Sequence, residues 1–249
     1  MSLSAALPLA AALAVALPGA ASAAPAPPRS LAAKCIDTSG VDAQPFWLTA
    51  SDGTRLYAIE TGRGTTTVVL AHESPADLCG WLPYIPTLAA AGLRVLAFDF
   101  RNYGDSARPP VRAATAYGRD LAAAVARARA DGAGRVFLMG ASFGGAAALT
   151  YGPALRLAGL ISLSGEARLD NMNALRAVRR LRAPLLIVGS RHDRYASVRE
   201  MLQLYRRAGS KDKRTAFYPG AFHGWSIVET APYAARARAL ILSWIRARS

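Results

Sequence analysis

Short apolar runs alternate with helical segments along most of this 249-residue chain, and this alternation constrains the fold more than any other feature. The runs are nearly continuous in apolar residues, which is typical of strands that are buried on both faces of a sheet. A hairpin is predicted at 46–59, further strands at 67–71, 94–98, 136–139, 160–163, 185–188 and 215–218, and helices at 82–91, 120–130, 198–207 and 232–248. We therefore predict an α/β fold with a mainly parallel twisted sheet and helices on both faces.

The segment Gly140-Ala141-Ser142-Phe143-Gly144 directly follows one predicted strand and fits the pattern G-x-S-x-G. This pattern is typical of a sharp strand-to-helix turn that exposes a serine hydroxyl at the carboxyl end of a parallel strand, where such sheets bind ligands. We predict that Ser142 is a nucleophile and that the Phe143 N–H, at the start of a helix, stabilises an oxyanion. A purely structural glycine-rich turn is the alternative.

With this motif the chain resembles the α/β-hydrolase superfamily, and most of all its compact bacterial dienelactone-hydrolase-like and esterase-like serine hydrolases. The resemblance covers residues 46–247 and rests on motifs that occur in the family's order. They are His72-Glu73-Ser74-Pro75, where many relatives have His-Gly-x-Pro, the loop 98–106, the serine turn, and an acid followed by a late histidine. The chain departs from the family pattern at Glu73 and Asn102, where glycine is usual.

A serine needs a neighbouring base to become a nucleophile, and this chain has only three histidines. The resemblance places the base at His223, after the last predicted strand, whereas His72 is interpreted as structural and His192 as exposed. Asp193 follows the preceding strand and is predicted to accept a hydrogen bond from the His223 ring and to orient it. Asp170 is the alternative acid, because some relatives carry the acid one strand earlier.

The resemblance also predicts a second backbone donor for the oxyanion hole at Ser74, with Glu73 as the alternative. About eighteen residues separate two predicted strands around 166–182, which is too few for a large cap domain. The site is therefore expected to be open and covered at most by that segment. A substrate-binding pocket for an acyl group is predicted from three large apolar side chains, with core packing as the alternative: Trp81, Met172 and Trp225.

Residues 1–23 carry no charged side chain and end in Ala21-Ser22-Ala23, which fits a signal-peptide cleavage site. We predict a signal peptide at 1–23, an extended linker at 24–44 and a catalytic domain at 45–249, so that the protein is periplasmic or secreted. An uncleaved membrane anchor is the alternative. In an exported protein, the two cysteines Cys35 and Cys79 are expected to form a disulfide rather than to remain separate thiols.

The net charge of +14 comes largely from arginines that cluster in the predicted helices. No nucleic-acid-binding motif accompanies them, so a solvated surface is favoured and no nucleic-acid partner is expected. Loose association with an anionic envelope or lipid stays open, as does the oligomeric state. No spacing of metal ligands and no phosphate-binding loop is present, so neither a metal nor a cofactor is expected.

These features together predict an exported serine hydrolase that cleaves a small carboxylic ester through an acyl-enzyme. The same three residues would also support thioester or amide hydrolysis or acyl transfer. The alternative to an enzyme is a protein that has the hydrolase fold but is non-catalytic or binds polyanions.

Overall fold

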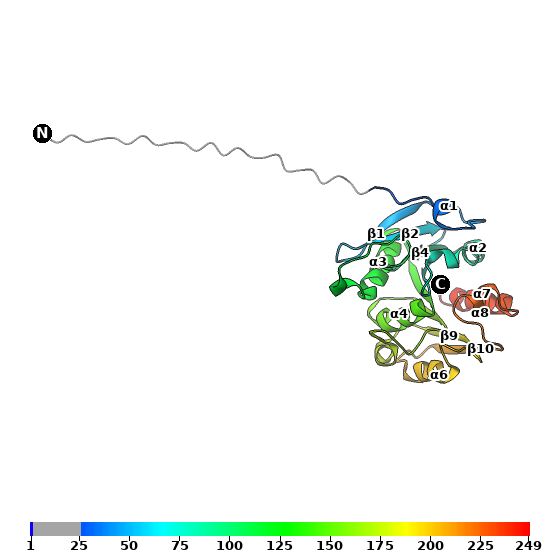
Figure 1. Ribbon diagram of the computed structural model, residues 1–249. Coiled ribbons are helices and arrows are strands. Elements are labelled where there is room, and N and C mark those ends of the chain that lie inside the picture. Colours follow the sequence, from blue (N-terminus) through cyan, green and yellow to red (C-terminus); the bar gives the residue numbers. More distant parts are fainter. Residues whose placement is uncertain (2–25) are drawn as a thin grey trace.

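The computed structural model describes residue 1 and residues 26–249 (Figure 1). Apart from Met1, the predicted signal peptide lies outside the described residues. The main strands are β1 Pro45–Thr49, β2 Arg55–Thr61, β3 Thr66–Ala71, β4 Arg94–Phe98, β5 Arg135–Ala141, β6 Gly159–Leu163, β9 Leu185–Ser190 and β10 Lys213–Tyr218. They form one eight-stranded sheet in the order β1-β2-β4-β3-β5-β6-β9-β10. Only the β1–β2 and β2–β4 pairs are antiparallel, so the prediction of a mainly parallel sheet is confirmed.

Helices cover both faces of this sheet, as predicted (Figure 1). Two hydrophobic cores lie between the sheet and these helices, one on each face. The first core is covered by α3 Tyr117–Ala130, α4 Phe143–Tyr151 and α6 Val198–Arg207. The second core is covered by α2 Ile85–Ala90, α7 Ser226–Glu229 and α8 Ala234–Arg246. Val69 of β3 enters the first core, and its neighbours Val68 and Leu70 enter the second. Because successive side chains point to opposite faces, a strand between two cores must be apolar throughout.

The structure shifts several predicted boundaries. The last helix begins at Ala234 instead of residue 232, and α7 precedes it as a separate turn. Between β6 and β9 lie the small hairpin β7 Arg168–Leu169 and β8 Met172–Asn173, the turn α5 Ala174–Ala177 and a 3₁₀ turn at Val178–Arg180. No cap domain is inserted in this fully described segment, as the short spacing predicted.

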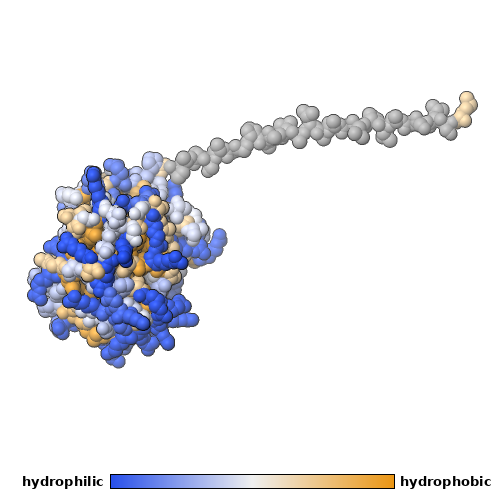
Figure 2. Space-filling model, turned by 180° about the vertical axis from the view of Figure 1, so that it is seen from behind, coloured by the Kyte–Doolittle hydropathy of each residue, from blue (hydrophilic) through white to orange (hydrophobic). Residues whose placement is uncertain are grey.

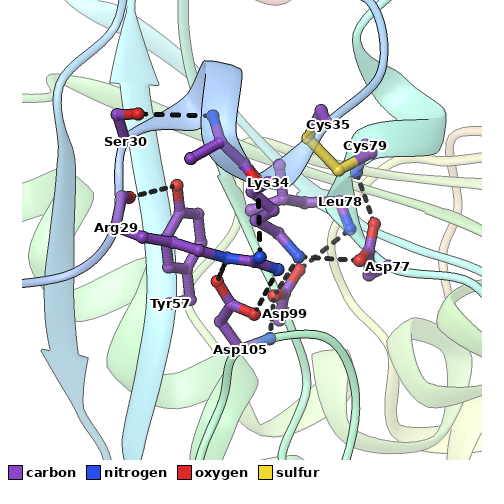
Figure 3. The surroundings of a disulfide bond; sticks show 11 residues. Arg29, Ser30, Lys34, Cys35, Tyr57, Asp77, Leu78, Cys79, Asp99 and Asp105 are labelled. Carbon is purple, nitrogen blue, oxygen red and sulfur yellow. Dashed lines mark hydrogen bonds and ion pairs between the residues drawn. A yellow bond between two sulfur atoms is a disulfide. The ribbon is translucent and has the colours of Figure 1, made fainter.

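The N-terminal strap, defined here as residues 26–35, is fastened to the domain rather than free. It contains the helical turn α1 Leu31–Lys34, which the prediction of an extended linker did not include. The Trp47 indole N–H donates to the Ala26 carbonyl at 2.7 Å, and the Tyr57 hydroxyl donates to the Arg29 carbonyl at 3.0 Å. The structure also joins Cys35 to Cys79 in a disulfide, the pair that the sequence suggested (Figure 3).

Hydrophilic side chains cover much of the face seen in Figure 2, with smaller apolar areas between them. Many arginines are exposed, among them Arg176, Arg179, Arg180, Arg206 and Arg207. Within residues 26–249, every helix is either too short or too polar to cross a bilayer.

Candidate active site

Ser142 occupies the turn between β5 and α4, with φ 47° and ψ −115°. A non-glycine residue rarely adopts a positive φ, and such strain is typical of functional turns. A Cβ on Gly140 would lie 2.2 Å from the carbonyl oxygen of Gly144, and a Cβ on Gly144 would lie 2.2 Å from that of Ala71. Both glycines are therefore required by close approach of the backbone, which explains the spacing of the motif.

The predicted acid and base meet at the carboxyl ends of the adjacent strands β9 and β10. The Nδ1 atom of His223 lies 2.9 Å from both carboxylate oxygens of Asp193. Asp193 Oδ1 also accepts the backbone N–H groups of Tyr195 and Ala196, at 2.9 and 3.1 Å. The alternative acid, Asp170, lies exposed in the turn between β7 and β8.

The surroundings of His223 favour its protonated form. Burial alone would lower the pKa of His223, but the hydrogen bond and charge of Asp193, with further contributions from Glu73 and Glu166, raise it above its ordinary value. Burial opposes ionisation of Asp193, and the hydrogen bonds to that carboxylate outweigh burial and lower its pKa. An ionised Asp193 holds the proton of the neutral imidazole on Nδ1, which leaves Nε2 as the proton acceptor.

Ser142 and His223 line the same cleft, which has a volume of about 490 Å³. The other lining residues are Glu73, Ser74, Pro75, Phe143, Glu166, Leu169, Asp170 and Tyr195. The expected covering segment 166–182 thus forms one wall. A hollow of about 460 Å³ beside Asp52 and Arg119 is lined by neither a serine nor a histidine.

Two lining residues were not singled out from the sequence. Glu166 follows β6, and Tyr195 follows the acid Asp193 by two positions. Tyr195 is 70% exposed, and its ring centroid lies 4.8 Å from that of His223. Both residues belong to no motif, and only their nearness to strand ends could have suggested them.

The three side chains predicted to form an acyl pocket lie outside the cleft lining. Trp81 is fully buried, and its ring centroid lies 6.1 Å from that of Trp225 in an edge-on arrangement. Met172 is buried in the first core. Large apolar side chains near a site gain most from burial against other apolar groups, so the core-packing alternative describes these residues. Leu169, which belongs to the segment expected to cover the site, supplies an apolar side chain to the cleft wall.

The loop after β3 is held by His72, which is fully buried. Its Nδ1–H donates to the Glu73 carbonyl at 2.9 Å, and its Nε2 accepts the Phe100 N–H at 3.0 Å. Burial lowers the pKa of His72 to about 4, so this ring is neutral near pH 7. Next to it, the Tyr103 hydroxyl donates to the Ser74 hydroxyl at 3.1 Å. His72 thus has the structural environment that the sequence interpretation expected.

The loop after β4 is braced by a buried arginine. Arg101 contacts the carboxylates of Asp120 at 2.6 Å and Asp52 at 2.8 Å. Asn102, where the resemblance predicted glycine, adopts the left-handed conformation with φ 69°, which asparagine tolerates better than most residues. The loop therefore keeps its turn despite the substitution.

Residues 68–247 match the model of the alpha/beta hydrolase family, and the chain belongs to this family. Among named relatives, bifunctional epoxide hydrolase 2 of Rattus norvegicus is 44% identical over 64 residues, which is 26% of this chain and 11% of the rat protein. Epoxide hydrolase B of Mycobacterium tuberculosis is 33% identical over 102 residues, 40% of this chain and 29% of that protein. The chain thus matches less than a third of either relative's length.

Solved structures of esterases share the fold. The Pyrococcus furiosus esterase Pf2001 has a TM-score of 0.74 at 18% identity, over 83% of this chain and 93% of that chain. A thermophilic esterase from Thermogutta terrifontis has a TM-score of 0.70 at 20% identity, over 83% of this chain and 100% of that chain. At these identities the structural likeness shows the α/β-hydrolase fold alone. The family match and the epoxide hydrolase relatives, taken together with this fold, support a hydrolase.

Proposed function

We propose that the protein hydrolyses carboxylic esters through a Ser142–His223–Asp193 triad and an acyl-enzyme. The observation that carries the proposal is the 2.9 Å contact between His223 and Asp193 in the cleft that Ser142 also lines. The Ser142 hydroxyl attacks the acyl carbon while Nε2 of His223 takes its proton, and Asp193 stabilises the imidazolium. The proton then passes to the leaving alcohol. A water molecule, deprotonated by the same base, releases the acid.

The oxyanion formed in each step would be stabilised by the N–H groups of Phe143 and Ser74. Phe143 is the first residue of α4, and the first N–H groups of a helix have no acceptor within it. The Glu73 carbonyl is turned toward His72. In a trans peptide the following N–H points the opposite way, so the Ser74 N–H is directed away from that interior histidine. This supports Ser74 over Glu73 as the second donor.

A serine nucleophile favours acyl chemistry over the epoxide opening named for the relatives. Attack of Ser142 on an acyl carbon forms an ester, which water and a general base can hydrolyse. Attack on an epoxide carbon would form an ether that the same machinery could not cleave, so the enzyme would be consumed. The substrate class we propose is therefore a small ester or related acyl compound.

Export is a further part of the proposal. A disulfide between Cys35 and Cys79 suits an oxidising compartment, and the uncharged segment 1–23 suits a secretory signal. The destination would be the periplasm or the exterior. An uncleaved anchor remains the alternative, which the mass of the protein recovered from the producing cell would reveal.

The test is hydrolysis of p-nitrophenyl esters from acetate to palmitate by the mature protein, by Ser142→Ala and by Ser243→Ala. Ser243 lies exposed on α8 and serves as a matched control. We expect turnover to disappear only in Ser142→Ala and a fluorophosphonate to label Ser142. Parallel thioester and anilide substrates separate the sister activities. Failure of all substrates and of labelling would leave the non-catalytic alternative, and salt-sensitive binding to anionic vesicles would then support an envelope-binding protein.

A further inference from the structure

Glu73 follows His72 in the loop after β3, and its side chain lines the cleft and reaches the loop that carries His223. Its Oε2 accepts the backbone N–H of Trp225 at 3.1 Å, although 152 positions separate the two residues. Glu73 also lines the cleft together with His223 and Ser74. One carboxylate therefore connects the loop of the oxyanion donor with the loop of the base.

The base loop is shaped to receive this carboxylate. Gly224, between His223 and Trp225, has φ 57°, and a Cβ there would lie 1.7 Å from Glu73 Oε2. A side chain at position 224 and the present placement of Glu73 exclude one another. The placement of the Glu73 carboxylate thus depends on the glycine at position 224.

We propose that Glu73 is a positioning residue for the catalytic base, an inference that rests on the function proposed above. It acts in two ways. The hydrogen bond to Trp225 fixes the loop that presents His223 to Ser142, and the negative charge beside the imidazole stabilises the imidazolium that forms as the serine loses its proton.

Other charged groups lie near His223 and Glu73, and their effects on the pKa of His223 must be distinguished from the effect of Glu73. His223 also faces Asp193 from the loop after β9 and Glu166 from the loop after β6, while Glu229 of α7 lies near Glu73. Burial raises the pKa of Glu73, whereas the Trp225 N–H and the charge of His223 oppose that rise. Burial likewise raises the pKa of Glu229, to about 8, so Glu229 is largely neutral near pH 7.

The first test is an NMR titration of the imidazoles, which needs no substrate. The chain has only three histidines, so Asn substitutions at His72 and His192 assign the signals. Glu73→Gln retains an oxygen that accepts the Trp225 N–H but loses the charge, and Glu73→Ala loses both. We expect both variants to lower the pKa of His223, and Glu166→Gln, the matched control without the loop contact, to lower it less.

The second test is steady-state kinetics on the ester that the wild type cleaves best. We expect the acid limb of kcat/KM to move to lower pH in Glu73→Gln, with kcat falling about tenfold, less than the roughly 100-fold loss typical of a missing oxyanion donor. Glu73→Ala should lose more than Glu73→Gln, because the base loop is also released. Unfolding curves of each variant establish that it is folded before its kinetics are compared.

A double-mutant cycle completes the design. Gly224→Ala should destabilise the wild type more than it destabilises Glu73→Gly, in which the overlap with the carboxylate is absent. An unchanged His223 pKa in Glu73→Gln, or additive effects in the cycle, would overturn the inference. Absence of ester hydrolysis by the wild type would refute the proposed function and leave the titration and the cycle interpretable.

Discussion

The ammonium group of Lys34 lies 3.0 Å from the carboxylate of Asp99 and 2.7 Å from that of Asp77, and the Lys34 side chain is fully buried (Figure 3). Asp99 also accepts the backbone N–H groups of Leu78 and Asp105, both at 2.9 Å. A lysine of the N-terminal strap is thus the shared partner of the two loops that follow β3 and β4. These loops carry the Ser74 and Tyr103 side chains that meet beside the cleft.

Replacing this lysine should cost much of the stability of the domain. In Lys34→Met the carboxylates of Asp77 and Asp99 would face each other without a cation, and breaking a buried pair typically costs about 3–5 kcal/mol. Urea unfolding of the mature protein measures the loss. Arg248→Gln is the control, since it removes a partly exposed pair with Asp212 and should change stability by less than about 1 kcal/mol. Equal losses in both variants would contradict a special role for Lys34.

The Cys35–Cys79 disulfide closes a loop with a sequence separation of 44. In the chain-entropy model such a crosslink stabilises the folded state by about 4 kcal/mol, mainly by restricting the unfolded chain. The double variant Cys35→Ser/Cys79→Ser should therefore unfold at lower urea concentration. A reductant should shift the wild type toward the variant and leave the variant unchanged. A wild type that is insensitive to reductant under unfolding conditions would argue against this bridge.

The sequence was sufficient to predict the sheet and its two covering layers, because strand periodicity is a local signal. Short motifs likewise selected Ser142, His223 and Asp193 as candidates, and the structure places His223 in contact with Asp193 and in the cleft that Ser142 also lines. The contacts of Lys34 and Glu73 were not predictable in the same way. Each depends on a hydrogen bond or ion pair between segments that are far apart in the chain, which no local pattern encodes. Trp81 and Trp225 were predicted to line an acyl pocket as large apolar side chains, whereas in the structure their rings pack against each other outside the cleft lining.

Gly144 offers a test in which two effects have opposite signs. Alanine is a better helix former than glycine by about 1 kcal/mol, so propensity alone predicts that Gly144→Ala stabilises α4. However, the added Cβ would lie 2.2 Å from the backbone oxygen of Ala71, which cannot move without displacing β3. We expect loss of stability and loss of ester turnover. Gly134→Ala is the control, since its Cβ would lie 3.7 Å from the nearest atom, and it should be tolerated.

His72 should make the protein sensitive to mild acid. Burial lowers its pKa from 6.5 to about 4, so between these values the unfolded chain binds a proton that the folded chain does not. Stability is therefore lost as the pH falls through this window, by up to about 1.4 kcal/mol per pH unit for one group. Asp99, whose pKa burial raises to about 6, titrates in the opposite sense in the same range, so the effect must be measured as a difference. The free energy of unfolding of the wild type minus that of His72→Gln should become more negative from pH 6.5 to pH 4. Parallel pH profiles for the two proteins would show that the pKa of His72 is the same in the folded and unfolded chains, and that burial does not keep this ring neutral.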